Sequence, residues 1–171
     1  MEALIEHDTG GGWSIYLAPA PPASAQKSDL RGVTCDAGGG CWAVGGLFST
    51  SAGQQPLVEE NTGSGWGIVP GPIPAGSNVG YLDSVTCLST GQCWAVGSFD
   101  AAGTGIEQTL VEEETGSGWS IVTSPTPAQD AWLSGVTCTF DTDCAAVGVQ
   151  SPASGPGIPA PLILQTYPPT S

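Results

Sequence analysis

Six cysteines are the residues whose spacing points most directly to chemistry. They form three pairs of equal separation, Cys35 with Cys41, Cys87 with Cys93 and Cys138 with Cys144. Each pair spans a short predicted hairpin, where facing Cα atoms lie roughly 4.5 to 5.5 Å apart, a distance that a disulfide accepts. Zinc binding is the alternative, but zinc sites favour closer cysteines or added histidines, and the chain has one histidine. We therefore expect three disulfides and an extracellular, oxidising location.

The acidic and nucleophilic residues form no catalytic pattern. Ser-His-Asp chemistry needs a positioned base, yet the only histidine, His7, lies at a strand end and is replaced by Glu60 and Glu113 in the other repeats. The run Glu112-Glu113-Glu114 alternates across strand faces and indicates a solvated edge, with calcium binding as a lesser alternative. No carboxylate pair is singled out for glycoside hydrolysis, so an acidic glycoside hydrolase is the least favoured function. We expect no enzymatic activity, no cofactor and no metal site beyond that calcium alternative.

Four residues are candidates for ligand binding. Tryptophan rings can serve as stacking platforms for sugars, and the competing interpretation is packing inside the fold. The candidate set is Trp42, Trp94 and Trp132 together with Asp100, which lies in an acidic loop. A second group of tryptophans, Trp13, Trp66 and Trp119, opens the outer strand of each repeat, where we expect packing between hairpins.

Composition removes two classes of partner. The chain has 2 Lys+Arg against 16 Asp+Glu, a formal net charge of -14, which disfavours nucleic acid phosphates and anionic membranes. The apolar runs are far shorter than the ~20 residues of a spanning helix, so no membrane insertion is expected. The start Met1-Glu2-Ala3 lacks the pattern of a signal peptide, which suggests a mature form or an excised piece of a longer chain.

These residues are carried by a repeat. Val-Thr-Cys followed by Cys-(Trp/Ala)-Ala-Val-Gly occurs three times, and the Trp13 group is spaced 53 residues apart. Each repeat of roughly 52 residues reads as a Cys hairpin followed by a Trp hairpin, four short strands in all, as in a propeller blade. Trp94-Ala95-Val96 is apolar throughout, as expected of a strand covered on both faces, which favours a propeller over a sandwich or a parallel β-solenoid. The fold class is therefore all-β, with essentially no α-helix.

The repeat boundaries predict one domain, 1–171, with incomplete ends. Glycine-rich and serine-rich loops are expected at 46–56, 98–108 and 149–161, and proline excludes the segments between hairpin pairs from central ladders. An extra third strand is predicted from Leu162 to Tyr167. The predicted units are a half-blade at 3–29, blades at 30–81 and 82–132, and an incomplete blade at 133–171.

The pattern resembles the Cys-bearing propeller repeats of extracellular bacterial proteins. Its turns are similar to the Asp-box of sialidase-type propellers and read Asp8-x-Gly10-x-x-Trp13, Asn61-x-Gly63-x-x-Trp66 and Glu114-x-Gly116-x-x-Trp119. Only the first turn keeps the acid, none has the leading serine, and the third Cys hairpin carries Ala145 in place of tryptophan. The resemblance implies a fold and not an activity. Sialidases hold their substrate with three arginines and short propeller lectins pair an aromatic with arginine, whereas Arg31 is the only arginine here.

Half-blades at both ends predict head-to-tail association. The Cys138 and Cys144 strands of one copy would be completed by the Leu4 and Trp13 strands of the next, giving a closed ring or a filament of identical chains. The alternative is that the chain is a slice of a longer propeller. The sequence thus favours a non-enzymatic structural protein that forms homo-oligomers, with a glycan-binding module as the second hypothesis.

Overall fold

The chain folds as four small antiparallel sheets. The structure is a computed structural model that describes residues 3–8, 10–101, 104–125, 127, 129–140, 143–152 and 158–166. Sheet A comprises β1 (Ile5–Asp8) and β2 (Trp13–Tyr16), and sheet B comprises β3 (Ala25–Cys35), β4 (Cys41–Ser49), β5 (Gly53–Asn61) and β6 (Trp66–Val69). Sheet C comprises β7 (Gly80–Cys87), β8 (Cys93–Asp100), β9 (Glu107–Glu114) and β10 (Trp119–Ile121), and sheet D comprises β11 (Ala131–Phe140), β12 (Asp143–Gln150) and β13 (Ala160–Gln165).

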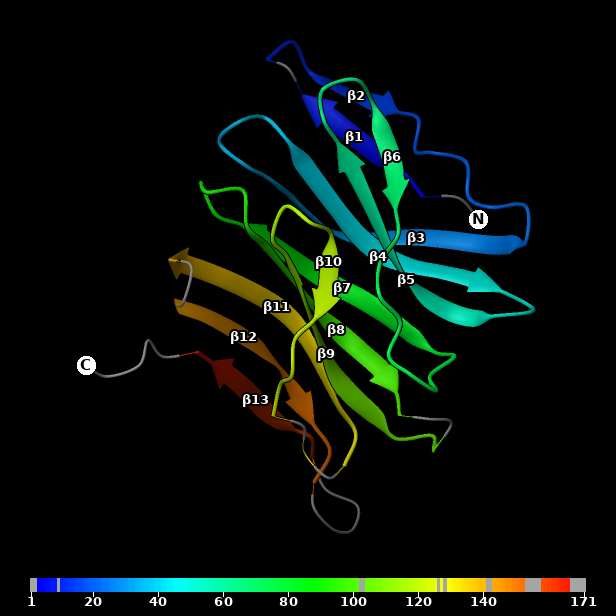
Figure 1. Ribbon diagram of the computed structural model, residues 1–171, viewed down its shortest axis with the longest axis vertical. Coiled ribbons are helices and arrows are strands. Elements are labelled where there is room, and N and C mark those ends of the chain that lie inside the picture. The colour runs from blue at the N-terminus through cyan, green and yellow to red at the C-terminus, as the bar shows by residue number, and fades with distance from the viewer. Residues whose placement is uncertain are drawn as a thin grey trace.

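The predicted fold class is confirmed as an all-β array of four-stranded sheets with smaller sheets at its ends. The sheets follow one another in chain order, with β1 and β2 at one end and β11 to β13 at the other (Figure 1). The first strands of neighbouring sheets lie together, since β7 contacts both β3 and β11. In the described part of the chain this stack is open and no closed ring forms. Those residues also contain no helix that could span a membrane.

The repeats share one strand register. Val44 faces Val58 in sheet B, Val96 faces Val111 in sheet C, and Val147 faces Ile163 in sheet D. Equivalent side chains therefore point to equivalent sides of each sheet, because facing residues of an antiparallel pair share a face. One consequence is that each sheet can present one apolar face to the sheet before it and another to the sheet after it.

The three predicted disulfides are present at the tips of the first hairpins. Their Cα atoms are 4.0 Å apart for Cys35 and Cys41 and 4.1 Å apart for the other two pairs, which are Cys87 with Cys93 and Cys138 with Cys144. They indicate an oxidising environment.

A glycine follows each Ala-Val of the second strand for a steric reason. A Cβ on Gly45, Gly97 or Gly148 would lie 1.9, 2.0 or 1.9 Å from a backbone carbonyl oxygen of the first strand, on residues 29, 81 and 132 respectively. No side chain fits at that distance. The repeated glycine is thus required by the close approach of the first and second strands.

Strands extend further than the sequence predicts. β3 begins at Ala25 and not at Leu30, and residues 46–56 are mostly strand, with a tight turn at Gly53, whose φ is 72°. Gly46 in that segment is closely surrounded: a Cβ there would lie 2.9 Å from Gln54 Nε2 of its own sheet and 3.6 Å from the Cβ of Tyr81 in the next sheet. The predicted extra strand is β13, which pairs with β12, while Tyr167 lies outside the described residues.

The core consists of two apolar clusters between sheets. The first lies between sheets B and C and includes Trp42, Val58, Leu82, Leu110 and Trp119. The second lies between sheets C and D, with Val96, Leu133 and Ala146 buried and Val111, Leu162 and Leu164 packed against them. Salt bridges contribute little by comparison, because Arg31, with its partners Asp29 and Asp83 at 2.9 Å, is the one arginine of the chain.

Candidate functional site

The candidate site lies at a position that is filled by side chains in the neighbouring interface, the one between sheets B and C. Between sheets B and C, the Trp119 ring of β10 lies edge-on to the Trp42 ring of β4, with ring centroids 5.4 Å apart and an interplanar angle of 79°. Both rings are buried, Trp119 to 8% exposure. Edge-to-face aromatic pairs of this kind stabilise by about 0.5 to 1.5 kcal/mol beyond their apolar burial.

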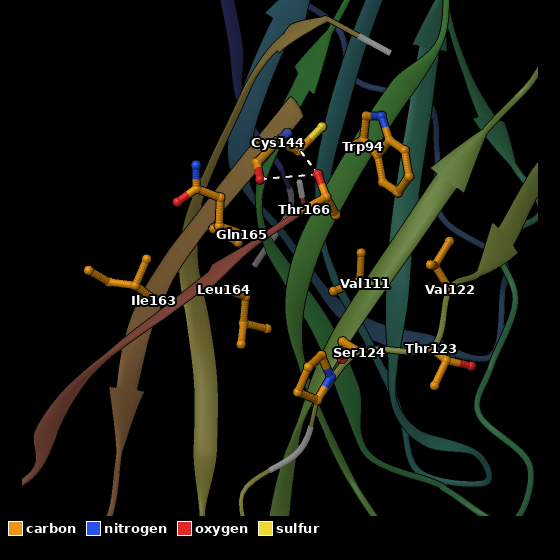
Figure 2. A pocket seen from close by; sticks show the side chains of 12 residues that line it. Trp94, Val111, Val122, Thr123, Ser124, Cys144, Ile163, Leu164, Gln165 and Thr166 are labelled. Carbon is orange, nitrogen blue, oxygen red and sulfur yellow. Dashed lines mark hydrogen bonds between the residues drawn. The ribbon is translucent and has the colours of Figure 1, made fainter. Parts of the chain in front are cut away.

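Between sheets C and D, the same place is a cavity of about 590 Å³. Trp94 occupies the register position of Trp42, because Trp42 faces Glu60 and Trp94 faces Glu113. Sheet D has no fourth strand among the described residues, so no tryptophan meets Trp94 there. The cavity is lined by Trp94, Val111, Val122, Thr123, Ser124, Pro125, Cys144, Ala146, Ile163, Leu164, Gln165 and Thr166 (Figure 2).

Sheet C fixes one wall of this cavity. The amide of Val122 donates to the carbonyl of Val111 at 2.9 Å, and the hydroxyls of Thr109 and Ser124 lie 3.0 Å apart. These bonds hold the chain beyond β10 alongside β9. The wall is therefore set by backbone and side-chain hydrogen bonds within one sheet.

The end of β13 fixes the opposite wall. The amide of Thr166 donates to the carbonyl of Cys144 at 3.0 Å, and the amide of Cys144 donates to the hydroxyl of Thr166 at 2.9 Å. Figure 2 shows Thr166 between Cys144 and Trp94, and it shows Ile163 pointing away from Trp94. The cavity side of this wall is thus formed by Leu164 of β13 and by Thr166, which directly follows β13, whereas the side chain of Ile163 borders the cavity but points away from Trp94.

The cavity is suited to binding and not to acid-base chemistry. Its lining residues are apolar or neutral, since Cys144 is disulfide-bonded and no carboxylate or imidazole is among them. The buried indole nitrogen of Trp94 has no hydrogen-bond partner among the described residues, and neither has that of Trp119. Trp119 is packed inside a complete interface and its indole nitrogen is unpaired among these residues as well. The unpaired nitrogen of Trp94 therefore does not indicate a ligand.

Sheet A and the residues directly beside its strands carry exposed apolar side chains at the other end of the array. Trp13 is 74% exposed, and Leu4 is 62% exposed. Ile15 and Leu17 are also exposed. Trp13 faces Asp8 as Trp119 faces Glu114, so the two tryptophans hold the same place in the repeat. The chain thus has a cavity at the place that Trp119 fills one repeat earlier. It also has an exposed tryptophan, Trp13, that is equivalent to Trp119 in the repeat.

Three glutamates are buried, namely Glu59, Glu112 and Glu114, so the predicted solvated edge at residues 112–114 is wrong for two of its three positions. Glu59 and Glu112 face Ala43 and Ala95, and both are essentially inaccessible to solvent. Burial raises the pKa of Glu59 to about 7 and that of Glu112 to about 8, because an ionised carboxylate loses hydration there. Neither carboxylate oxygen of Glu112 has a hydrogen-bond partner among the described residues. The signal that could have revealed this burial is the shared face with Leu110, two residues earlier.

Glu59 and Glu112 hold the same register position on different sheets, Glu59 on sheet B and Glu112 on sheet C. The described residues contain no group of three acidic, histidine or cysteine side chains that could hold a metal ion. Calcium binding therefore gains no support from the geometry.

The four candidate ligand residues do not come together. Trp42 is buried against Trp119, whereas Trp94 lines the cavity. Trp132 lies on β11, where it faces Val149. Asp100 ends β8, at the opposite end of that strand from Trp94, and its carboxylate accepts a hydrogen bond from the amide of Gly105 at 3.0 Å. Only Trp94 of the four lines the cavity; sequence reasoning missed the apolar residues Val111, Val122 and Leu164 that complete it.

The three Asp-box-like turns share one hydrogen-bond pattern. In each, a side-chain oxygen accepts the amides two and four residues later, and both amides belong to glycines with positive φ. The acceptors are Asp8, Asn61 and Glu114. These bonds lower the pKa of Asp8, since Gly12 and Gly10 donate to its ionised form. The turn therefore places the following tryptophan identically in all three repeats.

Comparison with known proteins adds no relative from which a role could be transferred. No protein-family model matches the chain, and no curated protein does either.

Proposed function

We propose that this chain is a non-enzymatic, extracellular structural repeat protein that self-associates head to tail. In this proposal, the Trp13 hairpin of one copy occupies the cavity beside Trp94 of the next copy. The observation that carries the proposal is the match between that cavity and the position of Trp119 one repeat earlier. A second copy supplies the missing side chain without any new kind of contact.

Two further features support association between copies. The exposed apolar residues of sheet A lie at one end of the array and the cavity at the other, so association of two different ends is heterologous and propagates. An uncovered apolar face on a sheet is costly in water, and terminal repeats usually have polar outer faces. Sheet A lacks a polar outer face, which favours its being covered by another copy of the chain.

Charge opposes this association and gives it a salt dependence. With a net charge of -14, copies repel one another at long range, and added salt screens that repulsion. The proposal therefore requires tighter association at high ionic strength, the reverse of an interface held by opposite charges.

Light scattering of the oxidised chain across a concentration series tests the proposal. We expect a defined ring or a polydisperse filament at high concentration, and Trp13→Ala should abolish it while Trp13→Phe retains part of it. Because Trp13 is exposed in the single copy, the alanine variant should remain folded, which circular dichroism checks. A wild-type chain that stays monomeric and folded at high concentration and high salt would contradict the proposal.

Glycan binding is the second candidate. The observation that favours it is the aromatic wall of Trp94 beside the neutral hydrogen-bonding side chain of Thr123 in an open cavity. A glycan array with wild-type chain and a Trp94→Ala variant tests it: binding by the first and not the second would support this function, and an array without hits would remove it.

A further inference from the structure

The strand β13 fills the place that the Trp13 hairpin would need in sheet D. Leu162 faces Gly148, Ile163 faces Val147 and Leu164 faces Ala146. In sheet B, the corresponding third strand is β5, where Val58 faces Val44 and Glu59 faces Ala43. By register, β13 is therefore a third strand. It is also the last strand of sheet D in the described part of the chain.

β13 departs from the other third strands at one position near its end and at one position directly after it. Leu164 stands where β5 and β9 have the buried Glu59 and Glu112. Thr166 stands where Asn61 and Glu114 organise the turn to the fourth strand, and its hydroxyl bonds the backbone of Cys144 instead. β13 thus closes the ladder of β12 without the turn that presents a tryptophan to the cavity.

β1 has both features that β13 lacks. Glu6 lies two residues before Asp8, and Asp8 makes the turn that places Trp13 opposite it. Leu4, Ile5 and Glu6 match Leu57, Val58 and Glu59 in residue type and order. The β1–β2 hairpin is therefore a closer match to the empty half of sheet D than β13 is.

We infer that head-to-tail association proceeds by strand exchange, in which the β1–β2 hairpin of a second copy replaces β13 in sheet D. The inference rests on the proposed function and names its interface. The register comes from the repeat: Leu4 of the second copy faces Gly148, Ile5 faces Val147 and Glu6 faces Ala146. Trp13 of the second copy then enters the cavity beside Trp94.

One register accounts for several exposed side chains at once. Leu4, which is 62% exposed, takes the place of Leu57 and Leu110, both of which are buried. Ile5 already lies beside Leu30 and Ala43 of sheet B in its own copy. When the hairpin of the second copy binds, sheet B of that copy is therefore placed next to sheet D. Val147, which is 47% exposed on the outer face of sheet D, is then covered by sheet B of the second copy. Addition of the hairpin outside β13 would leave Leu4 and Val147 uncovered.

Engineered disulfides at position 147 distinguish exchange from simple addition. In the full-length chain, Val147→Cys with Ile163→Cys would lock β13 onto β12, because these residues face each other. The matched control, Val147→Ser with Ile163→Ser, makes similar changes but cannot lock. We expect the locked variant to associate about tenfold or more weakly than the serine control.

A trapping experiment determines the register directly. A chain with Ile5→Cys is mixed with a chain with Val147→Cys, and mass spectrometry of the oxidised mixture should find positions 5 and 147 linked between two copies. A linked pair together with an inert locked variant supports strand exchange. If the locked variant associates as well as the serine control, exchange is wrong while self-association stands. If wild type does not associate at all, the proposed function itself is wrong.

Discussion

The interface between sheets B and C and the interface between sheets C and D use the same strands in the same register, yet only the first is complete. In the first, Trp42 is covered by Trp119; in the second, the equivalent Trp94 borders a cavity. The strands that carry the two tryptophans are alike in sequence and in pairing. Burial of a repeated residue is thus decided by the strand that the neighbouring sheet contributes.

The tryptophans of the outer strands show the same rule as a graded series. Trp119 has four-stranded sheet B before it and is 8% exposed, Trp66 has two-stranded sheet A before it and is half-buried, and Trp13 has no sheet before it and is 74% exposed. Their turns are equivalent, so the difference lies in the neighbours alone.

The largest expected difference in stability is between alanine variants at the two ends of this series, Trp119 and Trp13. Trp119→Ala should lower the free energy of unfolding by about 3 to 5 kcal/mol, because it empties the space against Trp42. Trp13→Ala should change the stability of the single copy by less than about 0.5 kcal/mol, because its ring is exposed. Urea denaturation at low protein concentration measures both. Equal losses would show that the local turn, and not the neighbouring sheet, sets the contribution.

The buried glutamate gives the next largest effect. The native state binds a proton at Glu112 up to a pKa of about 8, whereas the unfolded chain releases it near 4.5, so stability falls as pH rises through this window. Glu112→Leu, which reproduces the residue at position 164, should stabilise the protein by on the order of 3 kcal/mol at pH 7. Thermal unfolding from pH 4 to 9 checks this.

Glu59 provides the internal comparison for that measurement. Its pKa is raised to about 7, so its share of the pH dependence should end at lower pH than that of Glu112. A Glu112→Leu variant that keeps the full wild-type slope between pH 7 and 8 would mean that Glu112 is ionised in the native state.

A smaller effect separates sheet D from sheet C. Replacing both Cys138 and Cys144 with alanine should destabilise the hairpin by roughly 2 kcal/mol, since the bond closes a short loop. Hydrogen exchange should then show faster exchange in β12 and β13, whose end is bonded to Cys144, and unchanged protection in β8. The Cys87 and Cys93 double variant is the matched comparison; a uniform loss over both sheets in either variant would make the array one cooperative unit.

The smallest expected effect lies in the turns. Asn61→Ala removes the oxygen that accepts the amides of Gly63 and Gly65 and should cost about 1 kcal/mol. Asn61→Asp keeps the acceptor and should cost less, as the natural Asp8 indicates. Urea denaturation distinguishes them, and equal costs would show that the side chain does not hold the turn.

Local spacing in the sequence predicts a large part of this architecture. The Cys hairpins, the Trp hairpins and the disulfides depend on residues close in the chain, and all are found. The pairing partner of the Leu162 segment is not determined by local spacing, and in the structure it is β12 of the same chain. That choice depends on which strand edge is uncovered, which is a property of the folded array.

The candidate site is harder to predict because the same local sequence occurs in repeats whose neighbouring sheets differ. Trp42 and Trp94 share the sequence Cys-Trp-Ala-Val-Gly, so no local rule separates the buried one from the cavity-lining one. The burial of Glu112 is hidden in the same way, because an acidic run on a strand usually indicates solvent. Both outcomes arise from sheet-on-sheet contacts between residues about 50 positions apart.

The contacts of β7 give the array a shape with a further consequence. The first strands of successive sheets lie together, and the tryptophan of the fourth strand of sheet C, Trp119, packs between sheets B and C against Trp42. A large ring at this one position therefore helps to set the spacing between the two sheets. If copies associate as proposed, the same ring from the next copy would set the spacing at each junction, and so the curvature of the assembly.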